Sequence, residues 1–182
     1  MKYGKRLRNE VEKTLPEWKA QFICYKQLKK QLKLINPWSR SKMVQNQLSR
    51  LTSRGLLDVG FTRLLDSELD KVNTFYFDKE EDYIIRIKEL QIRVGNLENE
   101  EEKKMELQNH LLEFHAEMLL LLHYSVLNFI GLVKIVKKHN KRTGTSLEFS
   151  SMPRVMQESF FSTDLLYKLM TDCEAMLGRL FN

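Results

Sequence analysis

Apolar residues recur every three, four or seven positions along most of the chain, which predicts helices. The longest pattern runs from about 61 to 97, and a second one covers roughly 105–142. Only seven Gly and three Pro occur in 182 residues, which disfavours a protein of strands and turns. We therefore expect an all-α fold. Shorter patterns predict helices over 2–13, from about 15 to 35, from Pro153 to about Phe160, and from Ser162 or Thr163 onward.

The ends of these helices follow from local signals. Thr14 with Glu17 has the spacing of a capping box, which predicts that the second helix begins near residue 15. Residues 37–60 are rich in Ser, Arg, Asn and Gln with weak periodicity, and we expect a mobile connector there, with some helix around 43–57. Gly144 is a plausible C-terminal stop for the second long helix. One domain over 1–182 fits this length.

The apolar run Met118–Val133 is too short for a membrane span, since a span needs about 20 apolar residues. We expect a buried central helix and no membrane insertion. Cys24 and Cys173 are isolated on helical patterns, as core thiols are. The first residues lack an apolar signal core, and Lys2 replaces the Gly required for myristoylation. A reducing cytosol or nucleus fits these features.

Lysines recur with one spacing, K-x-x-K-K-x-x-K, in two segments, 26–33 and 134–141. At about 100° per residue each set falls on one helix face, opposite an apolar face. Tyr25 lies one turn before Lys29 at the border of the apolar arc, where its hydroxyl can meet a phosphate oxygen. A solvated face, or lysines that complement the helix dipole, would also explain one such stripe. The stripes comprise Lys26, Lys29, Lys30, Lys33, Lys134, Lys137, Lys138 and Lys141.

The positive charge is concentrated at the start of the chain. Residues 1–54 hold fourteen Lys or Arg against three Asp or Glu, whereas 61–109 hold eight against thirteen. Such a basic region fits nucleic acid, anionic lipid or a small polyphosphate, and net charge does not separate them. No helix-turn-helix, finger or RNA-binding signature supports direct nucleic-acid binding.

Catalytic motifs are weak. His110 and His115 are five residues apart and diverge on a helix, unlike a metal-binding HExxH pair. We find no Gly-rich phosphate loop or nucleophile elbow. The expectation is a protein without enzymatic activity, metal or cofactor.

Three blocks resemble the conserved blocks of SPX domains. They are MKYGKRLRNEVEKTLPEWKAQFICYKQLKKQLK at the N-terminus, FTRLLDSELDKVNTFYFDKEED at 61–82 and LNFIGLVKIVKKHNKRTG at 127–144. FFSTDLLYKLMTDCEAML at 160–177 is most similar to the stand-alone SPX proteins of plants. The resemblance implies an N-terminal helical hairpin packed on two long helices, with shorter C-terminal helices.

The resemblance also implies a receptor for inositol hexakisphosphate or an inositol pyrophosphate that reports phosphate status. Its phosphate-binding residues correspond here to Tyr25, Lys29 and Lys138. The family often has Tyr or Phe followed by Asp where this chain has His139-Asn140, and we expect both to face away from the stripe. A neighbouring lysine cluster would comprise Lys134, Lys137 and Lys141, with Lys2 and Lys33 at its rim.

Stand-alone plant members of the family bind MYB coiled-coil transcription factors of phosphate starvation when the ligand is present, and keep them from DNA. The resemblance therefore implies such a partner here, and a location in nucleus and cytoplasm. Two alternatives stay open: a regulatory SPX module of a longer transporter, polymerase or ubiquitin ligase, and a basic helical nucleic-acid-binding protein.

Overall fold

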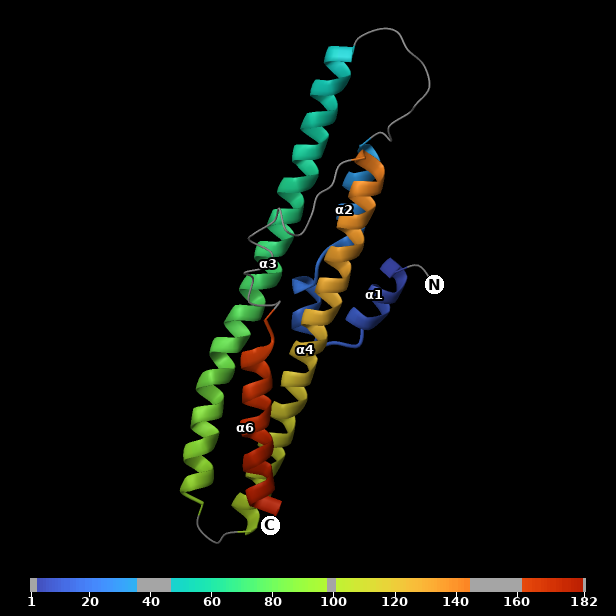
Figure 1. The fold of residues 1–182 in the computed structure, drawn as a ribbon. Coiled ribbons are helices and arrows are strands. Elements are labelled where there is room, and N and C mark those ends of the chain that lie inside the picture. Colours follow the sequence, from blue (N-terminus) through green and yellow to red (C-terminus); the bar gives the residue numbers. More distant parts are fainter. Residues whose placement is uncertain (1–2, 36–46, 98–100, 145–161, 182) are drawn as a thin grey trace. The chain divides into compact units, whose positions relative to one another are not determined.

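The computed structural model describes residues 3–35, 47–97, 101–144 and 162–181, with the side chains of 47–57 left aside. These residues are helical apart from short connections, so the all-α prediction is confirmed (Figure 1). The elements in chain order are α1 (Tyr3–Val11), the 3-10 helix η1 (Pro16–Gln21), α2 (Tyr25–Leu34), α3 (Gln47–Gly95), α4 (Glu101–Thr143) and α6 (Asp164–Phe181).

Contacts divide the chain into two compact units, and the long helices α3 and α4 contribute a part to each. The first unit comprises 1–72 and 127–158, and the second comprises 73–126 and 159–182. Figure 1 shows α1 and α2 beside the final part of α4 in the first unit. In the second unit α6 lies beside the first part of α4.

The core of the first unit joins the short N-terminal helices to the two long ones. Trp18 of η1, Leu28 of α2 and Phe61 of α3 are fully buried. Each such side chain contributes roughly 1.5–3 kcal/mol when it leaves water, so the N-terminal hairpin is held mainly by apolar packing. Further buried residues of this core are Leu7, Leu32, Ile35, Leu65, Leu132, Ile135 and Val136.

The second unit is a three-helix core with a charged cluster at its edge. The Glu117 carboxylate on α4 accepts hydrogen bonds from Lys79, Tyr83 and Arg86 of α3, at 3.2, 3.0 and 2.9 Å. Burial, followed by the Glu117 charge, raises the pKa of Tyr83. The buried side chains of this unit include Tyr76, Leu107, Leu111, Phe114, Met118, Leu166, Cys173 and Met176.

The boundaries differ from the sequence expectation most at residues 12–24. The predicted capping box is wrong, because the Thr14 hydroxyl donates to the Val11 carbonyl at 2.7 Å and no side chain caps η1. The second helix is not continuous from residue 15: η1 ends at Gln21, and α2 begins only at Tyr25. The first helix also ends earlier than predicted, at Val11.

The long helices fit the pattern better. α3 begins at Gln47, so residues 47–60 of the expected connector are helical, and 37–46 lie outside the described residues. Gly144 is confirmed as the stop of α4, with φ of 72° and its N–H bonded to the Asn140 carbonyl. The last helix begins at Asp164, directly after Thr163. The helix predicted from Pro153 to Phe160 also lies outside the described residues.

The two cysteines are free thiols. Cys173 is a core residue as predicted, and burial raises the pKa of its thiol to about 11. Cys24 is only half-buried, at the junction of η1 and α2.

Candidate functional site

Two backbone contacts fix the start of α2. The Ile23 N–H donates to Asn128 Oδ1 on α4, and the Cys24 N–H donates to Glu68 Oε2 on α3, both at 2.7 Å. Both groups lie in the break between η1 and α2, where no helical carbonyl is available to them. Buried backbone donors need a partner, and here side chains of the two long helices supply it. The first turn of α2, with Tyr25, is therefore held against both.

Arg142 of α4 holds the other end of α2. Its Nε donates to the Ile35 carbonyl at 2.5 Å, and a terminal guanidinium nitrogen donates to the Lys33 carbonyl at 3.0 Å. These carbonyls end α2, where helical acceptors lack partners. An arginine there both satisfies them and complements the helix dipole.

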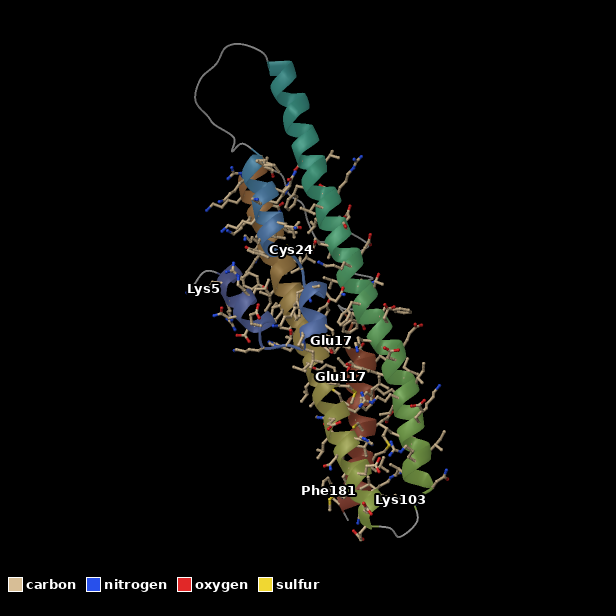
Figure 2. The ribbon with its side chains drawn as sticks, turned by 180° about the vertical axis from the view of Figure 1, so that it is seen from behind. Lys5, Glu17, Cys24, Lys103, Glu117 and Phe181 are labelled. Atoms are coloured by element: carbon tan, nitrogen blue, oxygen red, sulfur yellow. The ribbon has the colours of Figure 1, made fainter. Side chains whose placement is uncertain are left out.

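Together these contacts set the register of the two lysine stripes. Ile23 lies at Asn128 and Ile35 lies at Arg142, so α2 and the end of α4 run parallel. With a rise of about 1.5 Å per residue in both helices, Lys29 lies level with residues near 135. The two helices that carry the lysine stripes, α2 and the end of α4, thus lie side by side (Figure 1 and Figure 2).

The stripe lysines face solvent. Lys134, Lys137, Lys138 and Lys141 are exposed, as is Lys33, whereas Lys29 is half-buried. Within the described part of the chain, these lysines make no ion pair with a carboxylate. Their mutual repulsion is therefore not neutralised by the protein itself. Lys2 lies outside the described residues.

Tyr3 connects Tyr25 to the α4 lysines, a role that the sequence analysis missed. Its ring meets the Tyr25 ring edge to face, with 5.1 Å between centroids. Lys134 Nζ lies 5.4 Å from the Tyr3 ring centroid, within cation–π range. The Tyr3 hydroxyl donates to the Leu127 carbonyl at 2.8 Å, and burial raises the pKa of Tyr3 to about 12.

Glycines make room for this tyrosine pair. A Cβ on Gly131 would lie 3.0 Å from Ile23 Cγ2 and 3.2 Å from the Tyr3 hydroxyl. A Cβ on Gly4 would lie 3.3 Å from the Tyr25 ring. A glycine inside a helix lowers the stability of that helix, so it often marks a site where another group packs closely. Gly131, within the helical pattern of α4, was therefore a sequence signal for this contact.

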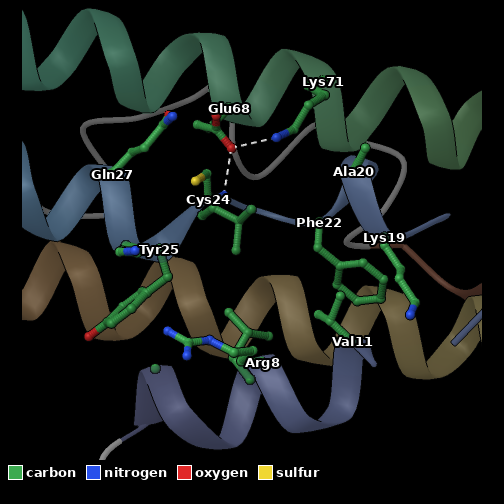
Figure 3. A pocket seen from close by; sticks show the side chains of 14 residues that line it. Arg8, Val11, Lys19, Ala20, Phe22, Cys24, Tyr25, Gln27, Glu68 and Lys71 are labelled. Atoms are coloured by element: carbon green, nitrogen blue, oxygen red, sulfur yellow. Dashed lines mark hydrogen bonds and ion pairs between the residues drawn. The ribbon is translucent and has the colours of Figure 1, made fainter. Parts of the chain in front are cut away.

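Tyr25 is buried, and burial raises its pKa. Tyr25 is one of the residues that line the cavity drawn in Figure 3. The burial of the ring agrees with the prediction, whereas the predicted contact of its hydroxyl with a phosphate stays a prediction.

This cavity, of about 430 Å³, lies beside the start of α2 (Figure 3). Its apolar wall includes Val11 and Phe22, and Arg8, Lys19 and Lys71 bring positive charge to it. Lys71 Nζ bonds the Glu68 carboxylate at 2.7 Å, and Lys19 bonds Glu12 at the same distance. Much of this charge is therefore already paired.

His139 is fully buried and stacks on Phe61 with 4.7 Å between ring centroids. Its Nε2 bonds Asp58 Oδ1 of α3 at 2.5 Å. His139 therefore faces α3 and not the exposed lysines, in agreement with the expectation that it points away from the stripe. Asn140 is half-buried.

The other histidines named above have separate surroundings. His110 contacts Arg93 and Glu106, whereas His115 contacts Glu174 on α6. No group of three or more His, Cys, Asp or Glu side chains that could hold a metal occurs among the residues that the structure describes.

α4 is the one described helix that is long and apolar enough to cross a membrane by length and composition. Its most apolar window has a mean hydropathy of 1.9 and is half buried by the fold. The core helix of a folded domain gives the same signal, so this is weak evidence for a span.

The side-by-side basic helices and the long helical scaffold define a helical domain with a basic surface, and comparison with known proteins gives its family. The family model of the SPX domain matches residues 96–155. SPX domain-containing protein 1 of Arabidopsis thaliana is 44% identical over 183 residues, covering 100% of this chain and 72% of the relative. The chain therefore belongs to the SPX domain family.

Other relatives are also plant proteins. SPX domain-containing protein 2 of Arabidopsis thaliana is 44% identical over 190 residues, covering 100% of this chain and 66% of the relative. SPX domain-containing protein 1 of Oryza sativa subsp. japonica is 46% identical over 193 residues, covering 99% of this chain and 65% of the relative. The chain thus spans about two thirds of the length of these relatives.

One solved structure covers the whole chain. It is the SPX domain of Chaetomium thermophilum Glycerophosphodiester Phosphodiesterase 1 in complex with inositol hexakisphosphate, with a TM-score of 0.78 and 27% identity. Each of the two chains is covered over 100% of its length. The predicted SPX-type fold is confirmed.

Proposed function

We propose that this protein is a receptor for inositol polyphosphates or pyrophosphates that reports phosphate status. The observation that supports the proposal is the parallel arrangement of α2 and the end of α4, the two helices that carry the lysine stripes. A solved relative holds inositol hexakisphosphate, which supports a ligand of this chemistry.

In this proposal Tyr25, Lys29 and Lys138 contact the ligand directly. Lys134, Lys137 and Lys141 extend the site along α4, with Lys33 and Lys2 at its rim. Lysine binds phosphate as a point charge, so a ligand with several phosphates can bridge both helices without a tight pocket. The ligand is bound and not transformed, so the protein acts without catalysis.

Bound ligand stabilises the folded chain by mass action. At a ligand concentration about 100 times the dissociation constant, this stabilisation is roughly 2.7 kcal/mol. The ligand also neutralises the lysine repulsion and so orders the surface around α2 and the end of α4. We propose that a MYB coiled-coil transcription factor of phosphate starvation recognises this ordered state, in nucleus and cytoplasm, and is kept from DNA.

A calorimetric titration with inositol hexakisphosphate tests the ligand. We expect one binding event whose affinity falls steeply between 50 and 300 mM salt, because charge attraction dominates it. Inorganic sulfate serves as the matched control for a single anion and should bind far more weakly. No heat of binding, or equal affinity for sulfate, would overturn the proposal.

The partner has its own test. A gel shift with the transcription factor and its DNA should lose the protein–DNA band when this protein and inositol hexakisphosphate are both added. Neither component alone should have this effect. A shift of bare DNA by this protein would instead favour direct nucleic-acid binding.

A further inference from the structure

The first part of α4 exposes a regular row of residues in the second unit. Met105, Leu112, Leu119 and Val126 recur every seven positions, and each is between 45% and 63% exposed. Asn109, Ala116 and His123 lie between them, so that the spacing alternates between four and three. We call these seven residues the α4 outer seam.

The seam is distinct from the face that α4 buries in the second unit. Leu107, Leu111, Phe114, Met118 and Leu121 are at most 1% exposed and form the inner face. The other two helices of this unit, α3 and α6, contact α4 at the two edges of this inner face. On the α3 edge Arg93 bonds Glu106, and on the α6 edge His115 bonds Glu174. The described residues of this unit therefore leave the seam uncovered.

Alternating steps of four and three are the spacing that packs one helix against another. Exposed apolar residues would be ordinary if they were scattered, but here they repeat every seven positions along one helix face, which is typical of an interaction site. The small Ala116 between Leu112 and Leu119 would let a second helix approach closely. The seam therefore fits an amphipathic helix better than a globular surface.

The charges beside the seam indicate what such a helix carries. Glu102 and Glu113 lie on the α3 edge, are exposed and have no ion pair among the described residues. Glu174 lies on the α6 edge and is also exposed, although His115 contacts it. Lysine or arginine on both flanks of the incoming helix would complement these carboxylates.

A second copy of this chain fits less well. An antiparallel pair of seams would place the edge with Glu102 and Glu113 against its own copy, and like charges at that position are destabilising. An anionic membrane also fits less well, because its negative charge would be repelled by the same carboxylates.

We propose that the α4 outer seam is a docking site for an amphipathic partner helix with apolar residues in heptads and basic residues on its flanks. This goes beyond ligand binding, since it uses none of the stripe lysines. A coiled-coil protein would present a helix of this kind.

Two synthetic helices test the proposal by fluorescence anisotropy. Both have leucines in heptads, one with lysine and one with glutamate at the flanking positions, where like charges also prevent the peptide from pairing with itself. We expect the lysine-flanked helix to bind at least tenfold more tightly than the glutamate-flanked one. The double variant Leu112→Gln with Leu119→Gln should lose this binding.

Two further variants test whether the peptide binds at the seam and whether the flanking charge determines its affinity. Ile85→Gln changes an exposed side chain on α3 and should leave peptide binding unchanged. Glu113→Lys should lower the affinity for the lysine-flanked helix and raise the affinity for the glutamate-flanked one. Circular dichroism should show native helix content and melting for all three.

Three outcomes would overturn the proposal. One is that neither peptide binds the wild-type protein, and another is that the Leu112→Gln, Leu119→Gln variant binds as well as wild type. The third is that sedimentation shows a wild-type dimer that the double variant converts to monomer, because the seam would then be an interface between copies.

Discussion

The rings of Tyr3 and Tyr25 pack edge to face, with 5.1 Å between their centroids and 76° between their planes. Tyr3 in turn bonds the Leu127 carbonyl and lies under Lys134. One residue of α1 thus supports a proposed ligand-binding residue of α2 and one of α4. The geometry of the site depends on α1 even though α1 carries neither stripe.

Substitutions at Tyr3 separate its ring from its hydroxyl. Tyr3→Phe loses one hydrogen bond and should cost about 1 kcal/mol in the free energy of unfolding. Tyr3→Ala also loses the packing on Tyr25 and should cost about 2–3 kcal/mol more. Urea unfolding followed by circular dichroism measures both, and equal stability of the two variants would contradict the role given to the ring.

Gly131→Ala tests the close approach at α4. The new Cβ would crowd Ile23 and the Tyr3 hydroxyl, so we expect a loss of about 1–3 kcal/mol in the free energy of unfolding. Gly178→Ala is the matched control, because it lies inside α6 with no atom within 4 Å of the new Cβ. There the gain in helix propensity should stabilise the protein by about 0.5–1 kcal/mol. Thermal melts compare the two, and changes of the same sign would count against this account.

Arg142→Ala should loosen the end of α2. It removes two hydrogen bonds from a charged donor to the Lys33 and Ile35 carbonyls, each contributing about 1.5–3 kcal/mol. Amide hydrogen exchange should accelerate in the last turn of α2 more than in α6. Lys141→Ala, an exposed neighbour, is the control, and its exchange pattern should match that of wild type.

Alkaline pH should destabilise the fold. Burial raises the pKa of Tyr3 to about 12 and that of Cys173 to about 11. A raised pKa means that the unfolded chain releases these protons first, so the stabilisation is complete below about pH 9 and is lost between about pH 9 and 12. Each group contributes a slope of up to ~1.4 kcal/mol per pH unit.

Melting temperatures from pH 7 to 11 measure this effect. They should stay level to about pH 8.5 and then fall, with a shallower fall in Cys173→Ala. A melting temperature that rises above pH 9 would refute the assignment.

The sequence predicted the long helices, their apolar faces and the stop at Gly144, because these depend on periodicity and local backbone chemistry. It failed between Thr14 and Tyr25 because the break there is set by tertiary contacts. Ile23 and Cys24 bond side chains 105 and 44 positions away, and no local pattern records them.

The candidate site also has features that the local sequence predicts and features that depend on distant contacts. The spacing within each lysine stripe is local, so it could be read from the sequence. That the two helices carrying the stripes lie side by side depends on Arg142 and Asn128, and the support from Tyr3 depends on the absence of a side chain at Gly131. These are distant pairings, which only the folded chain reveals.

The central claim is that lysines of α2 and α4 hold one and the same ligand. Calorimetry with inositol hexakisphosphate on wild type, Lys29→Ala and Lys138→Ala tests it most directly, with the exposed Lys88→Ala of the second unit as control. We predict one binding event with a stoichiometry of one, about 10- to 100-fold weaker in either stripe variant and unchanged in Lys88→Ala. Unchanged affinity in both stripe variants, or two separate events each sensitive to one lysine, would contradict it.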